Sequence, residues 1–241
     1  MKQFSPLTLT LIAAVSILLM ATLVLASQYR SLYIKYNASQ LDPLGLLDQI
    51  GITDQQNLEL AILGDSRAKH WAMALENTGN YRIANLGVAG QTSAQVRYRF
   101  AQQVSAARAE IIVIQLGIND LKQIALLPAR KEHIVAGCIE NIMAIIDMAR
   151  QAADQVVITT IFPRSKLSLA RHLVWSDEVD NAVREVNDVI RGLSLARVAV
   201  MDAAQIIGED GHVPQKFATD TLHINREGYA HLDLDSFLAR L

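Results

Sequence analysis

Short apolar runs alternate with longer amphipathic stretches along most of the chain. Five runs are continuous and often β-branched, as strands buried on both faces are: Leu58–Leu63, Tyr81–Leu86, Ile111–Leu116, Gln155–Ile161 and Val198–Met201. Helices are predicted between and after them, at Ala68–Asn77, Gln91–Ala109, Ala129–Ala153, Asp177–Leu193 and Arg226–Leu241. This alternation predicts an α/β protein, a three-layer α/β/α sandwich around a five-stranded parallel sheet.

A different pattern precedes this alternation. From Leu7 to Ala26 the chain is apolar and uncharged, with only Thr and Ser as polar interruptions. At about 1.5 Å per residue, such a run is long enough to span a bilayer core of about 30 Å. We therefore predict that residues 1–26 form an N-terminal transmembrane helix. Val24-Leu25-Ala26 also fits the cleavage pattern of a signal peptide, which stays as the alternative, although the run exceeds the usual length of a signal core.

The rest of the chain divides into two further parts. Residues 27–56 have mixed polarity and contain Pro43, so we expect a juxtamembrane stalk with at most a short helix there. Residues 57–241 carry the α/β pattern and are expected to form a single domain. Lys2 before the apolar run and Arg30 after it leave the charge bias weak. The usual behaviour of N-terminal signals favours a single-pass anchor with an extracytoplasmic domain, or a secreted domain if the segment is cleaved.

Composition and charge remove several classes of function. The chain has 22 Lys and Arg against 24 Asp and Glu, a formal net charge of −2, which gives no reason to expect a nucleic acid partner. Its single cysteine, Cys138, cannot form an intrachain disulfide and falls in an apolar helical pattern, so we interpret it as a core residue. The histidines lack metal-binding spacing, and neither a metal nor another cofactor is predicted.

Polar clusters follow the predicted strands. The first strand is followed by residues 64–66 (GDS), the second ends in residues 85–90 (NLGVAG), and the third ends in residues 117–120 (GIND). Residues 220–223 (DTLH) come after the fifth strand, just before the last helix. Because the carboxyl ends of parallel strands meet at one edge of a sheet, these four segments are expected to form one site.

The side chains in these segments suggest nucleophilic catalysis. A serine hydroxyl needs an adjacent base at neutral pH, and His223 is the candidate base for Ser66. Asp220, three residues earlier, is placed to accept the other ring N–H of His223 and so to stabilise the imidazolium. The backbone N–H of Ser66 is expected at a helix N-terminus, where it favours a developing oxyanion.

The four segments, in this order, resemble the SGNH hydrolase superfamily, also called GDSL-type esterases and lipases. Its Ser, Gly, Asn and His are matched by Ser66, Gly87, Asn119 and His223, and the resemblance runs from about residue 58 to 241. It implies a flavodoxin-like fold and an oxyanion hole made by the Ser66 and Gly87 backbone N–H groups and the Asn119 amide.

Three functions fit this resemblance. The first is a serine esterase that hydrolyses acyl esters of a small molecule, lipid or O-acylated glycan through an acyl-enzyme, without a cofactor. The second is an O-acyltransferase that uses the same triad to modify an envelope polysaccharide. The third is a non-catalytic binding module, which the intact Ser66, Asp220 and His223 disfavour.

The remaining residues of these segments receive secondary interpretations. Asp65 is expected to shape the turn around Ser66, and Asp120 to cap the segment that follows it. Arg67 stands where the GDSL label has Leu, and either a solvated helix face or a contact with an anionic or sugar-bearing substrate would account for it. The segment Phe162–Glu178 lacks periodicity, so we expect a loop beside the site, with Trp175 or His172 lining the substrate cleft.

Overall fold

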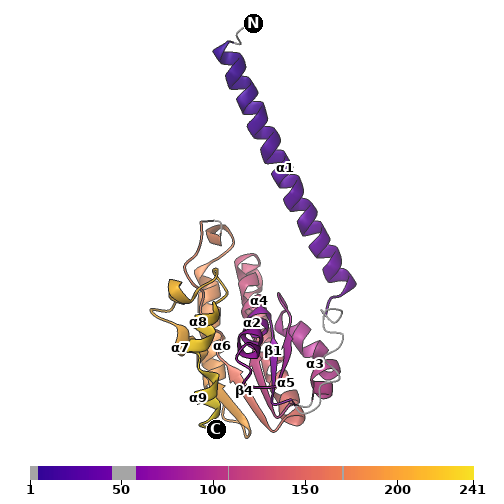
Figure 1. Ribbon diagram of the computed structural model, residues 1–241, viewed down its shortest axis with the longest axis vertical. Helices are drawn as coiled ribbons and strands as arrows, with labels where there is room; N and C mark the ends of the chain where they lie inside the picture. Colours follow the sequence, from indigo (N-terminus) through magenta and orange to yellow (C-terminus); the bar gives the residue numbers. More distant parts are fainter. Residues whose placement is uncertain (1–4, 45–57, 108, 170) are drawn as a thin grey trace. The chain divides into compact units, whose positions relative to one another are not determined.

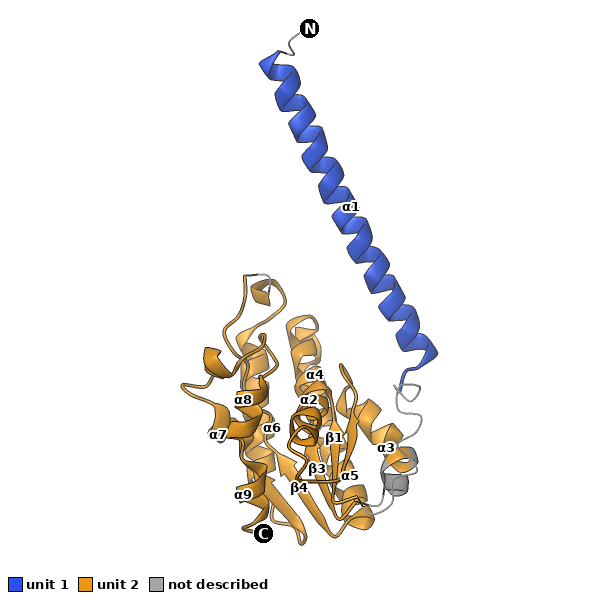
Figure 2. Cartoon of the chain, viewed as in Figure 1, with its two compact units in different colours: residues 1–45 blue, residues 46–241 orange. Residues whose placement is uncertain are grey.

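The computed structural model describes residues 5–44, 58–107, 109–169 and 171–241 (Figure 1). The chain divides into two compact units, residues 1–45 and residues 46–241 (Figure 2). The first unit is a helix and the second is an α/β domain.

The first unit contains one long helix, α1 (Pro6–Leu41). Ser5 caps its start by accepting the Thr8 N–H, and Pro6 occupies the first turn, where its missing N–H costs nothing. The helix runs through residue 27 without a break, so the first part of the predicted stalk is helical and belongs to a long helix rather than a short one. It ends just before Pro43, because a proline disfavours helical geometry in the preceding residue. The rest of the predicted stalk, residues 45–56, lies outside the described residues.

Helix α1 has no buried residue and is long and apolar enough to cross a membrane or to serve as a signal sequence. Its 36 residues correspond to about 54 Å of helix, which is longer than a bilayer core. Its polar C-terminal part therefore extends beyond the apolar run identified in the sequence.

The second unit is built on a five-stranded parallel sheet of order β2-β1-β3-β4-β5, as predicted. The strands are β1 (Leu60–Gly64), β2 (Ile83–Gly87), β3 (Ile111–Gln115), β4 (Gln155–Thr159) and β5 (Val198–Met201). The strand order reverses between β1 and β3. In open α/β sheets the crevice beyond such a switch point is the usual ligand site.

Helices cover both faces of this sheet, which confirms the three-layer sandwich (Figure 1). One face packs against α3 (Ser93–Ala107), α5 (Lys131–Ala152) and α6 (Asp177–Arg191). The other packs against α2 (Ser66–Glu76), α7 (Ala203–Ile207), α8 (Arg226–His231) and α9 (Leu234–Leu238). Short helices lie in the connections: α4 (Ile118–Leu121) and the 3₁₀ helices Lys122–Ala125, Pro128–Arg130, Arg171–Leu173 and Gln215–Phe217.

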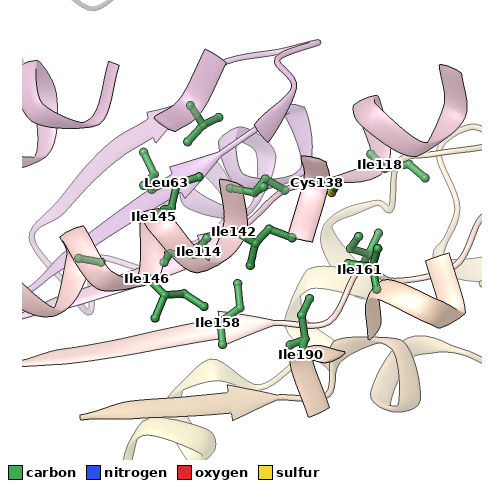
Figure 3. Close-up of a cluster of buried hydrophobic side chains, with 14 of the residues drawn as sticks. Leu63, Ile114, Ile118, Cys138, Ile142, Ile145, Ile146, Ile158, Ile161 and Ile190 are labelled. Atoms are coloured by element: carbon green, nitrogen blue, oxygen red, sulfur yellow. The ribbon is translucent and has the colours of Figure 1, made fainter. Parts of the chain in front are cut away.

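The core follows from the alternation of side chains along each strand. In β1, Leu60 and Ile62 pack against the α2 side, while Ala61 and Leu63 pack against the α3 and α5 side. Cys138 lies in this second cluster among isoleucines of α5 and the strands (Figure 3), which confirms its interpretation as a core residue. Each large apolar side chain buried in this way contributes about 1.5–3 kcal/mol.

The last predicted helix, Arg226–Leu241, is wrong in one respect, since the structure divides it into α8 and α9. The break is at Asp233, which has a left-handed backbone with φ of 45°. Its side chain accepts the Ser236 N–H and starts α9 as an N-cap. The apolar periodicity continues across the break and therefore conceals it in the sequence.

Candidate active site

The turn that carries Ser66 joins β1 directly to α2. Gly64 has a φ of 151°, and a Cβ there would lie 1.8 Å from the Gln115 carbonyl oxygen, so the turn requires glycine. Asp65 caps α2 by accepting the Arg67 N–H at 2.8 Å, which confirms its structural interpretation. Ser66 is therefore the first residue of α2, and its N–H is one of the helix's free donors.

The three predicted catalytic side chains lie in one hydrogen-bonded series. The Ser66 Oγ is 2.7 Å from the His223 Nε2, across 157 positions of sequence. The His223 Nδ1 is 2.8 Å from the Asp220 Oδ2. Because an ionised carboxylate only accepts, Nδ1 carries the proton in this arrangement, and Nε2 is left free to accept the Ser66 hydroxyl.

The loop that holds His223 is ordered around the Asp220 carboxylate. The Asp220 Oδ1 accepts the backbone N–H groups of Leu222 at 2.7 Å and of His223 at 2.9 Å. Burial raises the pKa of Asp220, but the hydrogen bonds from the His223 ring and from the two backbone N–H groups outweigh it, and the net pKa is lowered. Ser165 fastens the loop by donating its hydroxyl to the Asp220 carbonyl oxygen at 2.7 Å. Asp220 is thus held as an anion beside the imidazole.

The residues that follow His223 in the sequence shape the same region. Asn225 caps α8 by accepting the Gly228 N–H. The Tyr229 hydroxyl donates to the Arg67 carbonyl oxygen at 3.0 Å. The segment from Asn225 to Tyr229 thus connects the histidine loop to the helix that begins with Ser66.

Arg67 does not lie on a solvated helix face, which is one of the two expectations from the sequence. Its side chain is fully buried, with Nε donating to the Leu222 carbonyl and Nη1 to the Phe162 carbonyl, each at 2.8 Å. The guanidinium also lies 4.0 Å from the centre of the Phe162 ring. Burial lowers its pKa to about 10, so it stays charged at neutral pH. Arg67 therefore links α2 to the histidine loop, and it is also among the residues that line the cleft beside Ser66.

Asn119 lies at the start of α4, where β3 ends, and lines the cleft beside Ser66. Its Nδ2 donates to the Gln91 carbonyl at 2.9 Å, and its Oδ1 accepts the Lys122 ammonium. These two contacts fix the orientation of the amide. Since an amide nitrogen carries two hydrogens, a second N–H remains to bind a ligand.

Gly87, whose N–H the resemblance assigns to the oxyanion hole, is not among the described residues that line the cleft. Its N–H donates to the Asn85 Oδ1 at 3.2 Å, and a Cβ would lie 2.2 Å from the Lys69 backbone nitrogen. The glycine therefore allows α2 to pack closely on β2. From the same loop, Ala89 and Gly90 line the cleft, and Gly90 has a φ of 81°.

Asp120 caps a different element from the one expected. Its carboxylate accepts the Ser93 backbone N–H at 2.8 Å and the Ser93 hydroxyl at 2.6 Å, at the start of α3. Burial raises its pKa, and these hydrogen bonds oppose the rise. Asp120 thus stabilises an earlier helix than the one that follows it.

The cleft beside Ser66 has a volume of about 260 Å³. Besides Ser66, its lining includes His223, Asn119, small and apolar residues, and the basic residues Arg67, His70, Lys122 and Arg171. The His70 ring lies 5.2 Å from the His223 ring, centre to centre. Burial lowers the pKa of His70, and the neighbouring His223 and Lys69 lower it further.

The segment Phe162–Glu178 contributes Arg171 to this cleft, and neither Trp175 nor His172 is among the described lining residues. Trp175 is buried and donates its indole N–H to the Asp180 carboxylate. It lines a larger cavity, of about 620 Å³, between α6 and the segments after β4 and β5. The described lining of that larger cavity includes neither Ser66 nor His223, so the smaller cleft is the one at the reactive groups.

An α/β fold with a serine, a histidine and an aspartate in series is the arrangement of serine-dependent hydrolases. The model of the GDSL-like lipase/acylhydrolase family matches residues 51–231. The chain belongs to this family, within the SGNH superfamily that its sequence motifs resemble.

Known structures share the fold at low sequence identity. A GDSL-like lipase from Bacteroides thetaiotaomicron is 16% identical, with 76% of this chain and 89% of that chain covered and a TM-score of 0.57. A lipase from a goat rumen metagenome is 15% identical, with 76% of this chain and 97% of that chain covered and a TM-score of 0.54. A catalytic mutant of an acetylxylan esterase from Geobacillus stearothermophilus is 16% identical, with 76% of this chain and 93% of that chain covered and a TM-score of 0.50. A comparison with curated proteins gave no match.

Proposed function

We propose that the chain is a membrane-anchored serine esterase that hydrolyses short acyl esters through an acyl-enzyme. The observation that carries the proposal is the series from Ser66 Oγ to His223 Nε2 and from His223 Nδ1 to Asp220. This is the geometry that a serine needs to become a nucleophile at neutral pH.

The proposed reaction has two halves. Ser66 Oγ attacks the ester carbonyl carbon while its proton passes to the His223 Nε2, and His223 then gives this proton to the departing alkoxide. Water next attacks the acyl-enzyme, with His223 again accepting and returning a proton. Asp220 stays ionised throughout and stabilises the imidazolium.

The oxyanion is assigned to donors that reach the cleft. These are the backbone N–H of Ser66, the second amide N–H of Asn119 and, in place of Gly87, the backbone N–H of Gly90. Gly90 is supported by its position in the cleft lining, whereas the Gly87 N–H is already bonded to Asn85. Removing one such donor typically lowers turnover ~10²–10³-fold.

The size and openness of the cleft support small acyl groups and hydrolysis. Its volume of about 260 Å³ lies below the ~300–1,000 Å³ of pockets that enclose drug-sized ligands, so no long acyl chain is enclosed. The side chain of His223 is 24% exposed, which gives water access to the acyl-enzyme and favours hydrolysis over transfer to a sugar. In this proposal α1 holds the domain at the outer face of a membrane.

The test is an assay of the full chain in detergent micelles on 4-nitrophenyl acetate and 4-nitrophenyl decanoate. We expect a higher kcat/KM for the acetate and a loss of activity in Ser66→Ala on the order of 10⁶-fold. Ser194→Ala, at an exposed serine far along the chain, serves as the matched control. Equal activity of Ser66→Ala and wild type would refute the esterase, and acyl transfer to an added sugar without release of free acetate would favour a transferase.

A further inference from the structure

Two cations face the cleft without a carboxylate partner. Lys122 follows Asn119 by one turn and Arg171 comes from the segment after β4, and both line the cleft beside Ser66. In the part of the chain that the structure describes, neither side chain forms an ion pair within 4.0 Å. The described lining contains no Asp or Glu, so the mouth of the cleft is positively charged.

The position of Lys122 is costly without an anion. Its side chain is half-buried, and burial lowers its pKa. The Asp65 and Asp120 carboxyl groups oppose this effect on the pKa, whereas the Arg171 and Arg67 guanidinium groups add to it. A desolvated cation beside two other cations is stabilised by a bound anion.

The hydrogen bond from Lys122 to the Asn119 Oδ1 explains part of this arrangement. It orients the amide, and a neutral donor would do so equally well. It does not explain Arg171, which extends from another segment over the same opening. The two cations together indicate a site for an anionic ligand, because Arg and Lys bind carboxylates through charge-assisted hydrogen bonds.

We propose that Lys122 and Arg171 bind a carboxylate on the alcohol portion of the ester, and that the substrate is an O-acetylated uronic acid. The charge is assigned to the alcohol portion because a short acyl group has no room for one. A single sugar ring with its acetyl group also suits a cleft of about 260 Å³. This inference rests on the proposed esterase function and adds to it the class of substrate.

The experiment compares two acetyl esters that differ at one carbon: the methyl glycosides of 2-O-acetylglucuronic acid and of 2-O-acetylglucose. The readout is the ratio of their kcat/KM values for the full chain. We expect wild type to favour the uronate about tenfold, Lys122→Gln and Arg171→Gln to lower the ratio to about threefold, and the double variant to remove the preference. Arg130→Gln, at an exposed arginine outside the described cleft lining, should keep the wild-type ratio.

A wild-type ratio near one, or a preference that survives in the double variant, would overturn the inference and leave the esterase intact. If neither ester is hydrolysed, activity on 4-nitrophenyl acetate still decides the esterase proposal, and binding to Ser66→Ala decides the inference separately. Equilibrium dialysis should then show tighter binding of methyl glucuronide than of methyl glucoside, abolished by Arg171→Gln. Equal binding of the two glycosides would contradict it. If inorganic phosphate competes at lower concentrations than glucuronate, the site binds a phosphate rather than a carboxylate, and the assignment of a uronic acid is wrong.

Discussion

Asp220 holds the His223 ring with a carboxylate that also accepts two backbone N–H groups. In Asp220→Asn the Oδ1 can still accept the backbone groups, but the amide does not favour the required tautomer and adds no charge. We expect kcat for 4-nitrophenyl acetate to fall about 10⁴-fold while the melting temperature stays close to that of wild type. A drop of less than tenfold would show that Asp220 does not act on His223.

The Asp65 carboxyl gives a prediction for stability against pH. Burial raises its pKa from 3.8 to about 6, despite the nearby Arg67. Between these values the folded chain holds a proton that the unfolded chain has released, so this contribution to stability is lost as the pH rises through about 6.

Asp65→Asn keeps the acceptor for the Arg67 N–H and removes the titration. The free energy of unfolding of the variant, relative to wild type, should therefore increase between pH 4 and 7, by on the order of 1–3 kcal/mol. Urea unfolding at several pH values measures this difference. A constant difference across the range would mean that Asp65 titrates normally.

At this scale the sequence predicted the three side chains of the hydrogen-bonded series but not all of their surroundings. Ser66, His223 and Asp220 lie in motifs whose order along the chain can be recognised without knowledge of the fold. The partners of Arg67 are the backbone carbonyls of Phe162 and Leu222. Because every residue has a backbone carbonyl, a sequence does not indicate which of them accept a hydrogen bond. Gly87 ends β2 and Gly90 lies in the loop that follows, and only the path of the chain shows which of them lines the cleft.

At the scale of elements, buried strands were the most predictable feature. Continuous β-branched runs identify them, and their parallel order then brings the polar strand ends together. The break at Asp233 was missed because one left-handed residue does not disturb the apolar period on either side. The contribution of Arg171 was missed because the segment Phe162–Glu178 is irregular, and irregular backbone has no period to interpret.

The packing of α2 on β2 can be tested at Gly87. A Cβ there meets the Lys69 backbone at 2.2 Å, so Gly87→Ala must displace the helix that begins with Ser66. We expect a loss of about 1–3 kcal/mol in the free energy of unfolding, together with reduced ester hydrolysis. Gly137→Ala is the control, because its Cβ meets nothing within 4 Å and alanine favours the interior of α5. Equal stability of the two variants would contradict the proposed packing.

At the scale of the whole molecule, the chain combines an apolar helix with an α/β domain of the GDSL-like lipase/acylhydrolase family. If α1 is an anchor, the full chain should stay in the membrane pellet after alkaline carbonate extraction. If the domain is extracytoplasmic, added protease should digest it in cells whose outer barrier has been opened and whose cytoplasmic membrane is intact. A mature protein that begins at Ser27 would instead identify the segment as a cleaved signal peptide. Protection of the domain from protease would contradict its extracytoplasmic placement.

The central claim is that His223 activates Ser66, and covalent labelling tests it most directly. The full chain is treated with a fluorophosphonate probe, and the labelled residue and the labelling rate are measured by mass spectrometry. We expect a single adduct on Ser66, no adduct in Ser66→Ala, and labelling slowed at least a hundredfold in His223→Gln. An adduct on another residue, or a rate unchanged by His223→Gln, would contradict the account.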